Sequence, residues 1–508
     1  MAAGRPEAAP EIYVEAEQKG GTDMPEKEQR ILLQDAHEVN QHAEALPEMK
    51  LTQAMRKGME RGKMREKRRF YFWSTGTVMA LAAALLIINY SIGSLADRAE
   101  PAPEQTAGIP SQATLEPYRS TTLDGLASAM DRGLVKPIAQ SVEQKGYRVE
   151  VDGAVTDGRM AYVLFGVRNQ TDKEVINADI SLELGGVEAP SKGASVELAA
   201  SGSSRIPANG ANHFIYTVPL NPSVQYTKDA KFHVTLTETS NEALMSSSNK
   251  YRTAFDISFE LDPAMFKDKE RMLYPDRTLT VDGQRVRVTQ VLYTPLHTYV
   301  DLDYDQANGK KVFRLLSPVL IGKVGDKIEK LYYPKWYSPE NSEALTEGAD
   351  AMLMYGSSEK YAKLDSVSLK TEGVSAVDKD QLQIVIDLKK KQIVEAPDDR
   401  FTLISYTRPA GAGEVLIHRE LEHAYAGESL SLSLDNSFTD AEGNVHPMQS
   451  AEGYSQGGHS WSNKEDTMAD DYGYNFGKDA VDYPQPLTIK VKQMWMPIPD
   501  TQALELLR

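Results

Sequence analysis

The chain has 508 residues, no cysteine and a formal net charge of −17. The lack of cysteine excludes disulfides, thiol catalysis and thiolate zinc sites. The acidic balance argues against direct nucleic acid binding, because a negative field repels an anionic polymer.

The first 69 residues contain 13 basic and 13 acidic side chains, so the negative charge belongs to the rest of the chain. Residues 1–25 are rich in Ala, Pro, Gly and Glu and are predicted to be a disordered tail. Residues 26–69 are predicted to form two short amphipathic helices separated at Pro47, because apolar residues recur every three or four positions. The candidate partner-binding side chains on these helices are Leu32, Val39, Leu46, Leu51, Met55 and Met59. Short helices without a core are marginal in water, so we expect them to fold on a partner, on each other or on a bilayer.

Residues 70–96 contain no charged side chain and are long enough to cross a bilayer as one helix. A basic run precedes them and is expected to keep the N-terminus in the cytoplasm by the positive-inside rule. The topology-determining residues are Arg61, Lys63, Arg65, Lys67, Arg68 and Arg69. A buried core helix and a signal peptide cleaved after Ala96 are the alternatives. The expected location is the cell membrane, with one span and the C-terminus extracellular.

The remainder is predicted to be mainly β, with two, possibly three, extracellular antiparallel sandwich-like domains. A Pro-rich linker is expected at 97–121, and a helix at about 122–143 opens the first outer domain, 122–262. Beyond this helix, apolar and polar residues alternate in short runs separated by turn residues. The second outer domain is placed at 277–395, and 396–508 is a C-terminal extension of strands and loops.

The outer region also contains an internal repeat. Gly146, Val149, Val151, Tyr162, Val163 and Phe165 follow the same spacing as Gly283, Val286, Val288, Tyr299, Val300 and Leu302. Each copy predicts a strand, a connection and a returning strand. Duplication and chance similarity between two hairpins both remain open.

A search for chemistry predicts no catalytic residue, no metal site and no cofactor. Ser455 lies in a G-x-S-x-G pattern, but its flanks lack the strand and helix that this motif requires. His418 and His423 are spaced so that they would not share a helix face. The sequence from Asp440 to Asn444 starts like a calcium loop but has glycine at the wrong position, which favours an acidic turn.

Taken together, the basic juxtamembrane segment, the span and the stretch Gly146–Val155 resemble a family of single-pass membrane proteins of Gram-positive spore-formers. These proteins carry paired outer domains of unknown function and are often described as anti-sigma-factor-like. The resemblance covers about residues 46–395. It implies an inner segment that holds a cytoplasmic sigma factor and an outer segment that senses the state of the envelope. The chain lacks the His and two Cys of zinc-binding anti-sigma domains, which excludes that mode of binding.

We therefore expect a membrane-anchored regulator, not an enzyme, whose partners are a sigma factor and the lipid bilayer. The alternative is a structural or adhesive surface protein without a signalling role. The sequence does not identify an outer ligand.

Overall fold

The computed structural model describes residues 104–240, 242–243, 249–356, 364–404, 411, 413–421, 431–449, 458–462 and 467–507. This part of the chain is mainly β and consists of several antiparallel sheets, which confirms the predicted class. No helix within it combines the length and apolar character needed to cross a membrane. The predicted tail, cytoplasmic helices and membrane span all lie outside the described residues.

The first two sheets pack face to face around one hydrophobic core. Sheet A contains, in spatial order, β1 (Gln105–Ala107), β2 (Lys136–Gln144), β3 (Tyr147–Thr156), β4 (Met160–Asn169), β8 (Ala211–Pro219) and β7 (Ser195–Leu198). Sheet B contains β10 (Arg252–Glu260), β9 (Asp229–Glu238), β5 (Val175–Leu184) and β6 (Val187–Glu188). The rings of Phe165 from sheet A and Phe232 from sheet B form an edge-to-face contact with centroids 5.1 Å apart. Alternation along each strand therefore buries one side-chain row of each sheet.

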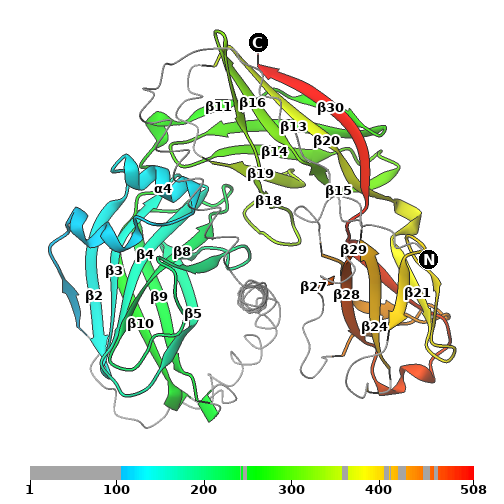
Figure 1. The fold of residues 1–508 in the computed structure, drawn as a ribbon, viewed down its shortest axis with the longest axis horizontal. Helices are drawn as coiled ribbons and strands as arrows, with labels where there is room; N and C mark the ends of the chain where they lie inside the picture. The colour runs from blue at the N-terminus through cyan, green and yellow to red at the C-terminus, as the bar shows by residue number, and fades with distance from the viewer. Residues whose placement is uncertain are drawn as a thin grey trace, which may run out of the picture. The chain divides into compact units, whose positions relative to one another are not determined.

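A second pair of sheets follows the same principle. Sheet C contains β11 (Arg271–Leu273), β13 (Gln284–Tyr293), β14 (Thr298–Tyr304), β19 (Ala351–Tyr355) and β18 (Lys335–Tyr337), with β12 (Arg277–Val281) also paired to β13. Sheet D contains β15 (Lys310–Leu316), β20 (Ser366–Asp378), β16 (Val319–Val324), β17 (Lys327–Leu331) and β30 (Pro497–Leu507). The C-terminal strand β30 runs antiparallel to β20 along most of its length (Figure 1). The sequence analysis assigned residues 497–507 to the C-terminal extension, but they complete the second pair of sheets.

The third pair of sheets is built from the residues between β20 and β30. Sheet E contains β22 (Gln392–Glu395), β21 (Gln383–Asp387), β29 (Leu487–Gln493), β25 (Ser433–Thr439) and β26 (Val445–Pro447). Sheet F contains β23 (Phe401–Ile404), β24 (Glu414–Leu421), β28 (Thr467–Asn475) and β27 (Gly458–Ser462). Strands β21 and β22, expected in the second domain, thus pair with strands of the C-terminal region.

In the described part of the chain, the labelled helical segments are short. They are η1 (Gln112–Tyr118), α4 (Asp124–Asp131), η2 (Asn249–Tyr251), η3 (Lys267–Lys269), η5 (Lys379–Gln381) and η7 (Lys478–Val481). The helix expected at 122–143 is α4, and its second half is the strand β2. Gly133, at φ +65°, ends the helix in a Schellman arrangement in which Leu134 N–H donates to the Ala129 carbonyl at 2.8 Å. Pro137 then favours extended backbone over helix.

The two copies of the repeat adopt the same structure. In each, a turn with glycine at positive φ, Gly146 or Gly283, leads into β3 or β13, and the chain returns as β4 or β14. The register shifts at the corresponding place in both hairpins, after Val151 in the first and after Val288 in the second. A β-bulge at a conserved place in two hairpins is a specific feature of strand geometry, which favours duplication over chance.

Candidate functional site

The residues that the sequence predicts to be functional are not among those that the structure describes. Both sets, the partner-binding residues and the topology-determining residues, lie outside the described part of the chain. The partner-binding set is Leu32, Val39, Leu46, Leu51, Met55 and Met59, and the topology set is Arg61, Lys63, Arg65, Lys67, Arg68 and Arg69. Ser455 and His423 also lie outside. The site described below comes from the tertiary structure.

Residues 104–132 are folded onto the first pair of sheets. They follow the predicted membrane span and are here called the membrane-proximal segment after that prediction. Its strand β1 extends sheet A by pairing with β2, and the Gln105 side-chain amide donates to Gln140 Oε1 at 2.9 Å. Next, η1 buries Leu115 and Tyr118. Leu115 of η1 approaches β3 closely at Gly153, where a Cβ would lie 2.6 Å from Leu115 Cδ2. This close contact requires glycine at position 153. The segment is therefore integrated into the fold, where the sequence predicted a linker up to residue 121.

Tyr118 carries a polar contact into the sheet. Its hydroxyl donates a 2.5 Å hydrogen bond to Asp152 Oδ2 on β3, and both residues are buried. Burial raises the pKa of Asp152 to about 7, and the hydrogen bond from Tyr118 offsets part of this effect. Arg148 lowers this pKa only slightly, since it forms an ion pair at 2.8 Å with Glu150. A carboxyl group that titrates near neutrality therefore holds the membrane-proximal segment.

The membrane-proximal segment also contacts the second pair of sheets through α4. A Cβ at Gly125 would lie 2.2 Å from His297 Cε1, so α4 packs directly against this ring. The Arg132 guanidinium donates to the Pro295 carbonyl in the same loop. One apolar cluster, here called the junction cluster, joins the segment to both repeated hairpins. Its main members are Leu115, Tyr118, Leu126, Met130, Val155, Met160, Tyr162, Leu164, Leu292, Leu296, Tyr299 and Met352.

Equivalent positions of the two hairpins meet in this junction. Asp157 and Thr294 occupy the same place in the repeat, and Thr294 Oγ1 donates to Asp157 Oδ2 at 2.6 Å. Tyr299 Oη donates to the same carboxylate at 2.8 Å, and its repeat partner Tyr162 lies in the same cluster. The two hairpins therefore use the same face toward each other, as the two subunits of an isologous dimer do.

A buried ion pair crosses the junction. Arg159 Nη2 lies 3.0 Å from Asp301 Oδ1, and both side chains are almost fully buried. Thr346 Oγ1 donates to the other oxygen of Asp301 at 2.7 Å, and the guanidinium lies 5.1 Å from the Tyr299 ring centroid. The repeat-equivalent positions are occupied by Leu296 and Leu164, which both belong to the junction cluster. The two repeats therefore differ here: one pair of equivalent positions holds an ion pair, and the other holds two leucines.

His297 occupies the centre of the junction. Its Nε2 lies 2.6 Å from Tyr162 Oη, and its Nδ1 lies 3.1 Å from the carbonyl of Tyr355. Burial lowers the pKa of His297, and the nearby Asp157 carboxylate opposes this only partly. The imidazole is therefore neutral at pH 7. Its protonation would place a charge where α4 and both hairpins meet.

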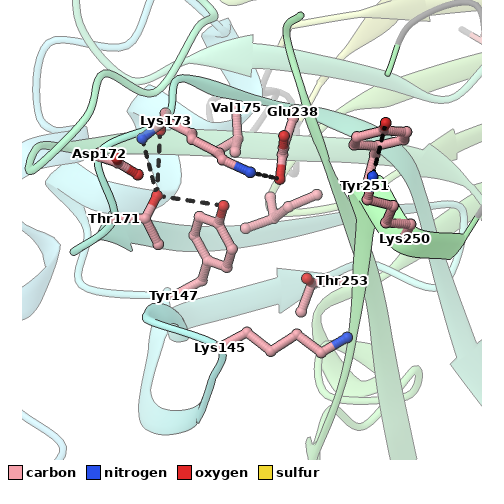
Figure 2. Close-up of a pocket in the computed structure, with 11 residues that line it drawn as sticks. Lys145, Tyr147, Thr171, Asp172, Lys173, Val175, Glu238, Lys250, Tyr251 and Thr253 are labelled. Carbon is pink, nitrogen blue, oxygen red and sulfur yellow. Dashed lines mark hydrogen bonds and ion pairs between the residues drawn. The ribbon is translucent and has the colours of Figure 1, made fainter. Parts of the chain in front are cut away.

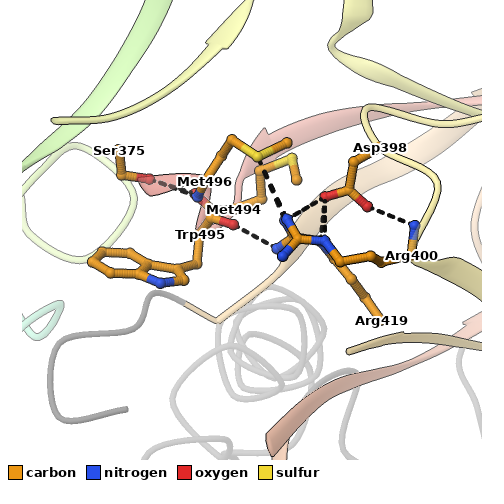
Figure 3. A network of polar contacts seen from close by, with 7 residues as sticks. All are labelled: Ser375, Asp398, Arg400, Arg419, Met494, Trp495 and Met496. Carbon is orange, nitrogen blue, oxygen red and sulfur yellow. Dashed lines mark hydrogen bonds and ion pairs between the residues drawn. The ribbon is translucent and has the colours of Figure 1, made fainter. Parts of the chain in front are cut away.

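A second polar network joins sheet D to the third pair of sheets (Figure 3). The fully buried Arg419 donates to Asp398 Oδ2 at 2.5 and 2.9 Å and to the Trp495 carbonyl. Ser375 Oγ on β20 accepts from Met496 N–H at 2.9 Å. Burial alone would raise the pKa of Asp398, but the hydrogen bonds from Arg400 and Arg419 outweigh it and hold the pKa low. This network fixes the chain where it returns to β30.

An open pocket of about 250 Å³ lies at one end of the first pair of sheets (Figure 2). Tyr147, Val175 and Leu236 contribute apolar surface, and the lysines on its rim alternate with carboxylates. Lys173 forms an ion pair with Glu238 at 2.8 Å. The rim neutralises much of its own charge, and the lining residues bring together no nucleophile with a base. The pocket therefore suggests no reaction.

The acidic stretch near Asp440 uses its oxygens internally. Asp440 accepts from the backbone N–H groups of Glu442 and Asn444 and lies 3.0 Å from His446 Nε2. These hydrogen bonds, that from His446 above all, hold the pKa of Asp440 well below its usual range. Among the described residues, no group of three or more His, Cys, Asp or Glu side chains is placed to hold a metal ion.

Sequence reasoning missed most of this site. The repeat pattern did include Tyr162 and Tyr299, but Asp152, Arg159 and Asp301 were not singled out. One signal was available: Asp301 is a charged residue within the otherwise apolar and buried run Tyr299–Leu302. A charged residue inside such a run indicates a buried partner, because an unpaired buried charge is costly.

No protein-family model and no curated protein matches this sequence. A conserved domain protein from Bacillus anthracis is 9% identical with a TM-score of 0.31, over 68% of this chain and 92% of that one. The CupB2 chaperone of Pseudomonas aeruginosa is 13% identical with a TM-score of 0.14, over 43% and 91% of the two chains. The secreted serine protease VesC of Vibrio cholerae is 11% identical with a TM-score of 0.14, over 44% and 48%. Likeness at this level carries no argument about function.

Proposed function

We propose that the protein is a single-pass membrane regulator of the anti-sigma type. In this proposal the helices at 26–69 bind a cytoplasmic sigma factor, and the β-rich outer region responds to the state of the envelope. The proposal rests on the amphipathic helices, the charge-free segment at 70–96 and the resemblance of residues 46–395 to a family of membrane proteins. The partners are the sigma factor and the lipid bilayer.

The packing of the membrane-proximal segment is the observation that best supports this function. A regulator needs a mechanical path from its outer domains to the membrane. Glu104 follows Ala96, the end of the predicted span, by a stretch of chain that reaches at most about 30 Å. From Gln105 onward the segment pairs with sheet A, and α4 packs on the loop of the second hairpin. A change in the junction would therefore act on the chain close to the span.

The cytoplasmic half of the proposal is tested by affinity purification of the tagged full chain from membranes of the native host. The wild type is compared with a Leu32→Asp, Met55→Asp double variant. Val445→Asp serves as control, since Val445 is 71% exposed in the outer region. We expect a sigma factor with the wild type and the control but not with the double variant. Identical partners from all three chains would contradict the proposal and favour a structural role for the outer domains.

The coupling is tested by a change that leaves the cytoplasmic residues intact. In Gly153→Val, the new side chain meets Leu115 and displaces η1 from sheet A. We expect the amount of sigma factor recovered to change severalfold. An unchanged amount, in a variant whose hydrogen exchange shows that η1 is loosened, would mean that the segment transmits no signal.

A further inference from the structure

The face of sheet D that points away from sheet C has an unusual composition at its β17 edge. On β16 and β20, the side chains that point toward sheet C, such as Leu320 and Leu369, are fully buried. The opposite row contains lysines and aliphatic side chains. Cross-strand pairing places Lys323 opposite Ile328, and Ile321 opposite both Lys330 and Ser368. This surface, here called the hairpin face, consists of Val319, Ile321, Lys323, Ile328, Lys330, Ser366, Ser368 and Lys370.

The hairpin face carries three lysines, and its lysines and Ile328 are exposed, whereas its other members are half-buried. Ile328 is 61% exposed, and Tyr332 and Tyr333, which follow β17, are 51% and 88% exposed. Its three lysines are exposed and make no ion pair with a described residue. The hairpin face itself contains no carboxylate, but acidic residues border it. Glu505 pairs with Ser368, and Asp326 and Asp365 lie at the turn beside Lys323. This composition contrasts with the net charge of −17 of the whole chain.

We propose that the hairpin face docks on a lipid bilayer that contains anionic phospholipids. Lysines attract anionic headgroups, tyrosines favour the headgroup layer, and aliphatic side chains enter the acyl boundary. A soluble anionic polymer would match the lysines but would leave Ile328 in water. The inference rests on the proposed membrane anchor, because tethering supplies a high effective concentration of bilayer.

The negative charge of the rest of the outer region favours one orientation of this region on the bilayer. An anionic surface repels most of the outer region, so the hairpin face is the orientation in which attraction and apolar burial coincide. Each lysine near such a surface contributes about a fivefold change in the docked-to-undocked ratio. Replacement of Lys323, Lys330 and Lys370 by glutamine should lower that ratio about a hundredfold. High salt should have a similar effect because it screens exposed charges.

The chain contains no cysteine, so one introduced cysteine gives a unique labelling site. Ile328→Cys in the full chain is labelled with an environment-sensitive fluorophore and reconstituted in lipid nanodiscs. The discs contain phosphatidylcholine alone or phosphatidylcholine with phosphatidylglycerol, and nitroxide lipids act as quenchers. We expect a blue shift and quenching only in the anionic discs, both lost in the triple lysine variant. Val445→Cys, an equally exposed site in sheet E, is the control and should remain aqueous in both discs.

Each result decides between docking and its alternatives. A label at position 328 that behaves like the label at 445 in both discs would overturn docking while leaving the anchor intact. A blue shift in detergent without lipid would also overturn it, because the face would then be covered by another copy of the chain. An equal shift in zwitterionic and anionic discs would exclude the role of the lysines. Failure of the chain to enter discs would remove the anchor itself, and docking with it.

Discussion

Tyr118 Oη and Asp152 Oδ2 lie 2.5 Å apart and connect the membrane-proximal segment to the middle of sheet A. Asp152 receives this one hydrogen bond from a described donor, so its charge state and the position of η1 are linked. The rings of Tyr118 and His213 form a T-shaped contact with centroids 5.7 Å apart, and burial lowers the pKa of this histidine. The contact therefore contains the groups whose protonation decides how firmly η1 is held.

The packing of the membrane-proximal segment on sheet A should become less stable as pH rises from about 4 to 7. The ordinary pKa of Asp152 is 3.8, and the folded value is about 7, so the folded state retains a proton that the open state has released. The stabilisation is complete below the ordinary pKa and is lost as pH rises through the folded value, by roughly 4 kcal/mol at most. Hydrogen exchange of residues 104–118, corrected for the intrinsic pH dependence, measures the opening free energy.

Two variants separate this effect from other titrations. Asp152→Asn accepts the hydrogen bond but does not titrate, so the loss of stability with rising pH should disappear. Any remaining change should have the opposite sign, because the lowered pKa of His213 destabilises the segment as pH falls. Tyr118→Phe removes the donor that lowers the pKa of Asp152, so the loss should move to higher pH. Identical pH profiles for the wild type and Asp152→Asn would disprove the assignment.

His297 should produce the opposite dependence at acidic pH. Burial lowers its pKa from 6.5, so the open state binds a proton before the folded state does. The stabilisation from neutral His297 is complete above pH 6.5 and is lost as pH falls through the folded pKa. Exchange in α4, which packs on this ring, should therefore accelerate in acid. In His297→Gln, which does not titrate, that acceleration should disappear; its persistence would locate the acid sensitivity elsewhere.

The ion pair between Arg159 and Asp301 should be costly to break but replaceable. Arg159→Leu leaves a buried carboxylate with Thr346 as its side-chain donor among the described residues, and we expect a loss of about 3–5 kcal/mol in unfolding free energy. The double variant Arg159→Leu, Asp301→Leu copies the two leucines, Leu296 and Leu164, at the equivalent positions. Urea denaturation at pH 7 should show a smaller loss for the double variant than for either single one. Additive losses would contradict this view of the junction.

Attachment of the C-terminal strand should depend on Gly373. A Cβ at this position would lie 2.1 Å from the carbonyl oxygen of Ile498 on β30, so Gly373→Ala forces β20 and β30 apart. We expect a loss of roughly 3 kcal/mol and fast hydrogen exchange in residues 497–507. Gly309→Ala is the matched control, because no atom lies within 4 Å of a Cβ there. If the two variants exchange alike, β30 is held by contacts other than this one.

Local patterns were enough to predict several of the longer strands. The alternating runs at 147–151, 214–218, 232–236 and 255–259 lie within β3, β8, β9 and β10. Alternation is a property of neighbouring residues, so it can be recognised without knowledge of the partner strand. The helix predicted at 122–143 is too long, because Leu134 and Ile138 continue the helical apolar spacing despite Gly133 and Pro137 in the same stretch. Those two residues were sufficient to predict the end of α4.

The sequence by itself determined the β class, the two repeated hairpins and their turns, because these depend on side chains a few positions apart. The pairing of strands that are far apart in the sequence is visible only in the tertiary structure. Thus β30 joins β20 rather than the extension that precedes it, and β21 pairs with β29. The contacts of Tyr118 with Asp152 and of Arg159 with Asp301 likewise join residues far apart in the sequence. A buried charge is stable only when its partner is brought to it, and no local pattern specifies where that partner will be.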